Sequence, residues 1–553
     1  MARFKLHHAL LAGAAFVAAA FAAPAQAATA CADLVKLKIP AGDIGLPSGG
    51  ATILSAAMAT VSADPATPDV KREYCQVLGA VQPVDPGAPP VNFQVNLPVQ
   101  WNGKAVQYGG GGSNGVLITG LNPLRDARGD TPVPVARGFA TWGTDAGHDN
   151  RKLKEPREFA LNDESLLNMA YASYKKTRDV GVRIATAFYD RRPAKLYFFG
   201  GSEGGREGLM MAQRFPNDFD GIVSVVPVVN YTGANLVRAR LGQLQRDGGW
   251  ISPAKVKLIH GAVTAACDKL DGLADGVIGA YEKCMKVFDV GTLRCPGGAD
   301  TGDSCLSDAQ LEAVRLTHRP FVYPFPMKHG VTSFPGWNYG GEDQPGGLVE
   351  TLTGMEKPQF PVKPGKTASI GWVNADGFVR YVFVRDPAFN SFDFKAADHA
   401  ARVREISEMF DTTDPDLSAF LARGGKLILK GNGADYQRSV MQEIAYYNSV
   451  VARMGQARVN QFVRFFVTPG VNHAGNGLLS SGAAVPAKVD MLGALDSWVD
   501  TGKAPEQLLQ VTQERQAPFT VTGSRPMCRY PLTPRYDGRG DPNEASSFAC
   551  AGQ

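Results

Sequence analysis

Short apolar runs alternate with longer amphipathic stretches along residues 91–226. Four of the runs predict β-strands, at residues 91–97, 104–108, 139–144 and 196–199. Residues 164–189, between the last two runs, carry apolar side chains at helical spacing. Such alternation of strand and helix favours a largely parallel sheet with helices on both faces.

The pattern changes after Pro227. Residues 228–395 are rich in Pro, Gly and aromatic side chains and lose the alternation. It then returns, with predicted strands at 426–429 and 462–467 and predicted helices at 439–454 and 487–501. We therefore expect one α/β domain interrupted by an insertion, and such insertions commonly cover a binding site. The expected segments are a signal peptide (1–27), the two parts of the α/β domain (28–227 and 396–553) and the insertion (228–395).

A candidate nucleophile lies between a predicted strand and a predicted helix. Residues 195–215 read KLYFFGGSEGGREGLMMAQRF, with Gly200-x-Ser202-x-Gly204 at the turn. A serine on such a sharp turn is held out beside a helix N-terminus and can attack a carbonyl. The same spacing recurs around Ser113, but that serine follows a glycine run and precedes no helical pattern. Ser202 is therefore the predicted nucleophile.

A serine nucleophile needs a base and an acid that orients the base, in the chain order Ser, Asp or Glu, His for this kind of scaffold. His473 is the only histidine beyond residue 399, and it lies in a glycine-rich loop after a predicted strand. Asp435 lies in the loop after the strand at 426–429. The only other acid between that strand and His473 is Glu443, which falls inside a helix pattern. We predict His473 as base and Asp435 as acid. The alternative for Asp435 is a turn residue that caps the following helix.

Backbone N–H groups that stabilise an oxyanion are also predicted. One is the N–H of Glu203, the residue after the nucleophile. The second is expected from the glycine run that follows the strand at 104–108, and Gly111 and Gly112 are equally good candidates. A flexible linker is the alternative for this run.

The N-terminus predicts export. Arg3 and Lys5 precede an apolar stretch, and Ala25-Gln26-Ala27 resembles a cleavage site, so the mature chain is expected in the periplasm or the medium. No later segment is long and apolar enough to span a bilayer. The net charge of +4 includes no basic run, so neither a membrane nor a nucleic acid is an expected partner. The sequence carries no signal for an oligomeric state.

Eight cysteines in an exported chain favour disulfides. Eight cysteines allow 105 pairings, and the sequence alone does not choose among them. Pairing of sequence neighbours would join Cys31 with Cys75, Cys267 with Cys284, Cys295 with Cys305, and Cys528 with Cys550. A zinc site is the alternative, but the chain contains no CxxC motif and no Cys–His cluster.

An acidic loop lies in the insertion. Asp268, Asp271 and Asp275 fall within eight residues, and glycines follow two of them. Carboxylates on a tightly turning loop suit a hard cation such as Ca²⁺, and the spacing is not that of an EF-hand. On the residues alone, a solvated acidic turn is an equally good interpretation.

Together these motifs resemble the tannase/feruloyl esterase family from Cys31 to the C-terminus. The resemblance rests on Trp101-Asn-Gly-Lys and the glycine run, on Thr144-Asp-Ala-Gly-His148, on Gly-Ser202-Glu-Gly-Gly-Arg206, on the acidic loop, and on the Asp435 and His473 loops. It implies an α/β-hydrolase fold with a large inserted lid domain that binds one structural Ca²⁺ and covers an aromatic ester. The ligands it implies are the side chains of Asp268, Asp271 and Asp275 and the backbone oxygens of Leu273 and Ile278.

One departure from the family pattern concerns the catalytic loops. Typical members join a cysteine before the nucleophile to a cysteine after the histidine, whereas this chain has Gly201 and Ala474 there. The eight cysteines that this chain has fall at the positions of the family's other disulfides. The hypothesis that follows is that packing alone holds these two loops and that the site is more mobile.

The sequence thus predicts an exported serine carboxylesterase for small esters of aromatic carboxylic acids of the feruloyl, galloyl or terephthaloyl type. Alternatives are a general esterase or an acyltransferase on the same scaffold, or a non-catalytic binding protein. Four aromatic residues of the insertion would either stack on the acyl group or form lid core: Trp372, Phe378, Tyr381 and Phe383. Arg380 or Arg385 would either pair with a substrate carboxylate or lie on the surface.

Overall fold

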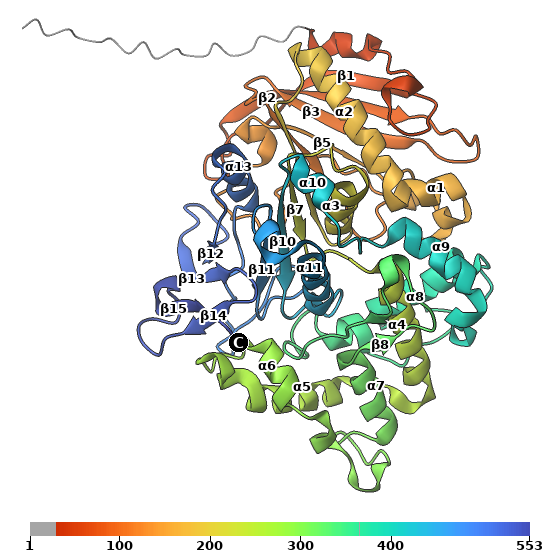
Figure 1. Ribbon diagram of the computed structural model, residues 1–553, viewed down its shortest axis with the longest axis vertical. Coiled ribbons are helices and arrows are strands. Elements are labelled where there is room, and N and C mark those ends of the chain that lie inside the picture. Colours follow the sequence, from red (N-terminus) through yellow and green to blue (C-terminus); the bar gives the residue numbers. More distant parts are fainter. Residues whose placement is uncertain (1–28, 364, 366) are drawn as a thin grey trace, which may run out of the picture.

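The computed structural model describes residues 29–363, 365 and 367–553, so the predicted signal peptide lies outside the described residues. Its centre is a nine-stranded sheet (Figure 1) in the order β1-β2-β3-β5-β4-β6-β7-β10-β11. In chain order the strands are β1 (Ala51–Ser62), β2 (Lys71–Val81), β3 (Val91–Pro98), β4 (Lys104–Tyr108), β5 (Ala140–Thr144), β6 (Lys195–Gly201), β7 (Gly221–Val225), β10 (Lys426–Asn432) and β11 (Val463–Thr468). The six strands from β5 to β11 are parallel, and β1, β2 and β3 add to them antiparallel.

Helices cover both faces of this sheet, as the alternating pattern predicts. One face packs on α2 (Ser173–Tyr189), α3 (Glu203–Arg214) and α11 (Val440–Met454), and the other packs on α13 (Met491–Thr501). Strand β6 shows the reason, because Phe198 faces α3 while its neighbours Tyr197 and Phe199 face α13. Side chains of a strand alternate between faces, so a continuous apolar run is buried on both. Three short helices complete this region: α1 (Asp163–Leu167), α10 (Ser418–Ala422) and α12 (Gln456–Val459).

The insertion is mainly helical. Its helices are α4 (Tyr231–Leu244), α5 (Pro253–Cys267), α6 (Tyr281–Val287), α7 (Asp308–His318) and α8 (Ile370–Phe378), with α9 (Ala400–Phe410) just beyond residue 395. A two-stranded ribbon joins β8 (Phe321–Val322) to β9 (Ser333–Phe334). In Figure 1 these elements, green to teal, gather at one end of the sheet. Two further ribbons near the C-terminus pair β12 (Gln507–Gln513) with β13 (Val521–Cys528) and β14 (Thr533–Tyr536) with β15 (Phe548–Ala551).

Four disulfides cross-link the described part of the chain. They join Cys31 to Cys75, Cys267 to Cys284, Cys295 to Cys305, and Cys528 to Cys550, which confirms the pairing of sequence neighbours. Within the described part of the chain, no helix combines the length and apolar character that a membrane span requires. These bonds fix two loops of the insertion, the segment at Cys31 and the C-terminal segment to the fold.

Candidate active site

Ser202, Asp435 and His473 come from three different strand ends. Ser202 follows β6, Asp435 follows β10, and His473 lies in the loop after β11. Because these strands are parallel, their carboxyl ends meet at one edge of the sheet, where α/β folds place their ligands. Three residues far apart in sequence are thereby brought together.

The three side chains form one hydrogen-bonded chain. His473 Nε2 lies 2.9 Å from Ser202 Oγ, and His473 Nδ1 lies 2.7 Å from Asp435 Oδ2. An ionised carboxylate only accepts, so Nδ1 carries the proton and donates it to Asp435. Nε2 is then the acceptor for the Ser202 hydroxyl. The arrangement is that of a serine nucleophile with an oriented base.

The turn at Ser202 is strained and tightly packed. Ser202 has φ 61° and ψ −120°, a backbone conformation that residues other than glycine rarely adopt. A Cβ at Gly204 would lie 2.6 Å from the carbonyl oxygen of Gly110, and one at Gly200 would overlap the backbone of Gly204. The two motif glycines are therefore required for the close approach of strand, turn and glycine run. Glycine at these positions lets Ser202 stand at the start of α3.

Hydrogen bonds distinguish Gly112 from the other glycines of the run. Gly109 donates to Phe199 O at 2.9 Å, Gly110 to Glu207 Oε2 at 2.9 Å, and Gly111 to Asn114 Oδ1 at 2.8 Å. Among the described residues, no partner is found for the N–H of Gly112. Gly112 also lines the cavity that contains Ser202. Of the two equally good sequence candidates, Gly112 is the one with a free donor.

Glu207, which the sequence reasoning missed, holds the glycine run in place. Its carboxyl accepts from Gly110 N and, at 2.7 Å, from Asn114 Nδ2, and it is fully buried on α3. Burial, together with the charge of Glu203, raises the pKa of Glu207 to about 7. The sequence does hold one signal for this role: Glu207 is a charged residue within a predicted helix whose other side chains pack on the sheet. Glu207 thus connects the helix after Ser202 to the loop opposite it.

The first turn of α3 is fixed by a buried ion pair. Arg206 Nε lies 2.6 Å from Glu203 Oε1, and both side chains are fully buried. Arg206 also donates to the carbonyls of Ala170 and Met169. The Glu203 backbone N–H, the predicted oxyanion donor, therefore lies on a rigid segment.

Burial and charge set the protonation of the base and the acid. Burial lowers the pKa of His473 below its ordinary value, although the adjacent Asp435 carboxylate opposes this shift. Burial disfavours the charge on Asp435, but His473 and Arg438 outweigh it and lower the pKa of Asp435. Backbone N–H groups of Gln437 and Arg438 also donate to Asp435 Oδ1, both at 2.9 Å. Asp435 therefore does stabilise a turn, as the alternative interpretation holds, while its other oxygen binds His473.

Arg125 occupies the space at Gly201, one of the two positions where typical family members carry the disulfide between the catalytic loops. A Cβ at Gly201 would overlap Cδ of Arg125, and the Arg125 guanidinium donates to the backbone carbonyl of His473. Arg125 lies in a loop without periodic pattern, so no sequence signal indicated it. The Ser202 and His473 loops are thus bridged by a side chain, in addition to packing.

The cavity at Ser202 measures about 320 Å³, within the range of small-ligand sites. Its walls combine the strand-end loops with α4 and α8, through Tyr231 and Arg238 on α4 and Asn374 on α8. The aromatic residues singled out in the sequence do not line it. Trp372 stacks on Phe392, and Phe378, Tyr381 and Phe383 are buried in the insertion. They form part of its core, and Tyr231 is the aromatic wall of the cavity.

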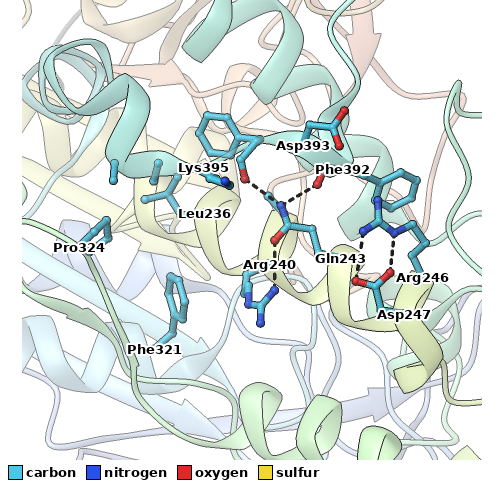
Figure 2. Close-up of a pocket in the computed structure, with 14 residues that line it drawn as sticks. Leu236, Arg240, Gln243, Arg246, Asp247, Phe321, Pro324, Phe392, Asp393 and Lys395 are labelled. Atoms are coloured by element: carbon cyan, nitrogen blue, oxygen red, sulfur yellow. Dashed lines mark hydrogen bonds and ion pairs between the residues drawn. The ribbon is translucent and has the colours of Figure 1, made fainter.

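Arg380 and Arg385 lie outside this cavity. Arg380 pairs with Asp376 on the same helical stretch, at 2.9 Å, and Arg385 pairs with Asp163 at 2.6 Å. A larger hollow of about 610 Å³ lies on the insertion (Figure 2), where Gln243 donates to the carbonyls of Phe392 and Phe394. This hollow contains none of Ser202, Asp435 and His473.

The acidic loop has the carboxylate ligands that a hard cation prefers, but these carboxylates do not converge on one point. Asp268 accepts from Gly276 N at 2.9 Å, Asp271 accepts from Leu273 N at 3.1 Å, and Asp275 pairs with Arg525. Burial, and also the charge of Asp275, raise the pKa of Asp271 to about 7. No three metal-binding side chains converge anywhere in residues 29–363, 365 and 367–553. Calcium binding at this loop stays a prediction.

Comparison with solved structures shows the fold. Feruloyl esterase B from Aspergillus oryzae superposes with a TM-score of 0.75 at 22% identity, covering 92% of this chain and 98% of that one. A tannin acyl hydrolase from Aspergillus niger gives a TM-score of 0.68 at 19% identity, covering 94% of both chains. The fold is therefore the α/β-hydrolase type that the resemblance implies.

Sequence comparison shows the family. The chain is 37% identical to an uncharacterized esterase of Agrobacterium fabrum, over 97% of this chain and 95% of that protein. It is 30% identical to a mono(2-hydroxyethyl) terephthalate hydrolase of Piscinibacter sakaiensis, over 93% and 91%. The family model for tannase and feruloyl esterase matches residues 75–551. The chain therefore belongs to the tannase and feruloyl esterase family and is a carboxylic ester hydrolase.

Proposed function

We propose that this protein is an exported serine esterase that hydrolyses esters of aromatic carboxylic acids through an acyl-enzyme. The observation that carries the proposal is the hydrogen-bonded chain from Ser202 through His473 to Asp435 inside a cavity. The family's ester-hydrolase activity supports the reaction class. Four disulfides support export, because such bonds persist in oxidising compartments.

The reaction follows from the positions of these groups. Ser202 Oγ attacks the ester carbonyl carbon while His473 Nε2 takes the hydroxyl proton. Asp435 keeps His473 in the required tautomer and stabilises the imidazolium that forms. The carbonyl oxygen becomes an oxyanion that accepts from the N–H groups of Glu203 and Gly112. His473 then gives its proton to the leaving alcohol, which departs as the acyl-enzyme forms.

The second half of the reaction repeats these steps with water. His473 takes a proton from a water molecule, whose oxygen attacks the acyl carbon. The intermediate collapses, Ser202 Oγ recovers the proton from His473, and the carboxylic acid leaves. The two N–H donors act in both halves because each passes through a tetrahedral oxyanion.

We also propose that residues 228–395 act as the lid and that Ca²⁺ binds its acidic loop. The side chains of Asp268, Asp271 and Asp275 would hold the ion together with the backbone oxygens of Leu273 and Ile278. An ion there would stabilise the lid and take no part in the chemistry.

Labelling with a fluorophosphonate tests the nucleophile. The reagent is expected to add one phosphonyl group to the mature protein, on the tryptic peptide that contains Ser202. A Ser202→Ala variant of unchanged circular dichroism is expected to stay unlabelled. Labelling of another serine, or none in the folded wild type, would refute the assignment.

A further inference from the structure

Four arginines line the cavity that contains Ser202. Arg125 bridges the Ser202 and His473 loops, and the remaining three are nearly fully buried. Arg157 precedes α1, Arg238 lies on α4, and Arg438 lies in the turn after Asp435. Their exposed fractions are 8%, 4% and 7%, so each is more than nine-tenths buried. Segments from three parts of the chain thus place three guanidinium groups beside one nucleophile.

None of the three is paired with a carboxylate among the described residues. Arg157 donates to Asn374 Oδ1 at 2.7 Å, and both Arg238 and Arg438 donate to the same acceptor, the carbonyl of Gln437. The Nε atoms of all three arginines are buried without a partner. No aspartate or glutamate lines the cavity. No ion pair therefore neutralises these guanidinium groups, and the charge of the nearby Asp435 offsets theirs only in part.

The other buried lysines and arginines of the described residues have acidic partners. Arg206 pairs with Glu203, and Lys430 pairs with Asp126 at 2.6 Å. This is the ordinary outcome, because a buried and unpaired charge is costly. Burial and the adjacent charge of Arg438 lower the pKa of Arg238, which reflects that cost. The nearby carboxylate of Asp435 is already engaged by His473 and two backbone N–H groups.

We propose that the cavity binds esters that carry a carboxylate remote from the scissile carbonyl, and that Arg157, Arg238 and Arg438 hold this carboxylate. The proposal rests on the function proposed above and names the substrate class of that site. Guanidinium forks match a carboxylate with paired, charge-assisted hydrogen bonds. A cavity of about 320 Å³ accommodates one aromatic ring with an ester and an acid group.

Matched esters test the preference. Monomethyl terephthalate carries the carboxylate on the acyl side, and dimethyl terephthalate and methyl benzoate are its neutral counterparts. On the alcohol side, 4-acetoxybenzoate is compared with phenyl acetate. We expect kcat/KM to be about tenfold or more higher for the anionic ester of at least one set, because charge-assisted hydrogen bonds are the stronger class. The set that shows the preference identifies the side on which the carboxylate binds.

Variants assign the preference to the arginines. In Arg238→Gln we expect kcat/KM for the preferred anionic ester to fall about tenfold or more while that for its neutral counterpart changes little. Arg157→Gln is expected to act in the same direction. Arg385→Gln is the matched control, because Arg385 pairs with Asp163 outside the cavity and its loss is expected to leave both rates unchanged.

A binding measurement separates this proposal from the esterase assignment. Terephthalate is expected to raise the melting temperature of the wild type and of Ser202→Ala, but not of Arg238→Gln. Equal rates on charged and neutral esters, with Ser202 labelled by fluorophosphonate, would overturn the carboxylate site and leave the esterase intact. Terephthalate binding without labelling would support the site and refute the nucleophile. Absence of terephthalate binding to the wild type would overturn the carboxylate site.

Discussion

The guanidinium of Arg125 lies over Gly201 and donates to the backbone carbonyl of His473. One side chain thus connects the segment before Ser202 to the loop that carries the proposed base. In typical relatives a disulfide ties these two loops, and here Gly201 and Ala474 stand at its positions. The contact is a non-covalent bridge at the place of that bond.

Loss of this bridge is expected to impair catalysis more than binding. In Arg125→Ala, kcat should fall about tenfold or more with a smaller change in KM, because a charge-assisted hydrogen bond to the His473 loop is lost. Steady-state kinetics on one aromatic ester checks this. Arg128→Ala is the control, since Arg128 lies in the same segment but pairs with Asp130. Equal effects of both substitutions would contradict the bridge.

The family's disulfide is expected to be incompatible with Arg125. Cysteines at both positions, in Gly201→Cys/Ala474→Cys, should lower the melting temperature, because a Cβ at Gly201 overlaps the Arg125 side chain. Adding Arg125→Ala should relieve the overlap, permit the bond and restore stability. Thiol titration and thermal melts measure both steps. A stable, fully oxidised double variant would argue against this packing.

Glu207 is expected to position the oxyanion donors. Glu207→Gln replaces one acceptor oxygen by an NH₂ group, which cannot accept from Gly110 N or Asn114 Nδ2. The glycine run should shift, and kcat should fall, though by less than the ~10²–10³ lost when an oxyanion donor itself is removed. KM and the melting temperature distinguish positioning from general damage. An unchanged kcat in a folded variant would exclude the positioning role.

The pH profile is expected to follow the buried histidine. Only neutral His473 accepts the Ser202 proton. Burial and the charges of Arg438 and Arg125 lower the pKa of His473 below 6.5, although Asp435 opposes the shift. Activity should therefore be retained as pH falls through 6.5 and be lost only at lower pH. The acid limb of kcat/KM against pH measures this value. An acid limb centred above 6.5 would be inconsistent with the burial of His473.

Calcium is expected to stabilise the fold without entering the chemistry. Ca²⁺ should raise the melting temperature of chelator-treated protein, by the equivalent of ~2.7 kcal/mol at a hundredfold excess over Kd. Asp271→Asn should abolish the shift, while Lys269→Ala, a change in the same loop outside the proposed ligand set, should retain it. Calorimetric melts with Ca²⁺ and Mg²⁺ provide the measurement. No Ca²⁺-dependent shift in the wild type would refute the proposed site.

The positions of Ser202, Asp435 and His473 could be predicted because the signals are local. Each follows a short apolar run that is buried on both faces, and glycines mark each turn. Strands β1, β2 and β7 were not predicted. For β1 the reason is that its Ala- and Ser-rich segment lies at the sheet edge, mostly exposed, without clear alternation. The sequence also could not decide between Gly111 and Gly112, because the difference is the hydrogen bond that Gly111 N donates to Asn114.

The walls of the cavity could not be predicted for a related reason. Arg157, Arg238 and Arg438 lie far apart in sequence or without periodic signal. The packing of α4 against the Asp435 loop brings Arg238 and Arg438 together, and the contact of Arg157 with Asn374 on α8 adds the third. Conversely, the composition makes Trp372 and Phe378 plausible substrate contacts, but their side chains pack within the insertion. Composition identifies aromatic residues, and tertiary packing decides which of them face the cavity.

Hydrolysis of aromatic esters by the mature wild type and by Ser202→Ala tests the central claim most directly. The panel is methyl gallate, methyl ferulate, chlorogenate and mono(2-hydroxyethyl) terephthalate, with p-nitrophenyl butyrate as the aliphatic reference. The account predicts turnover of at least one aromatic ester in preference to the butyrate, with a loss of about 10⁴–10⁶-fold in kcat in the variant. Turnover that survives Ser202→Ala, or activity on the butyrate alone, would contradict it.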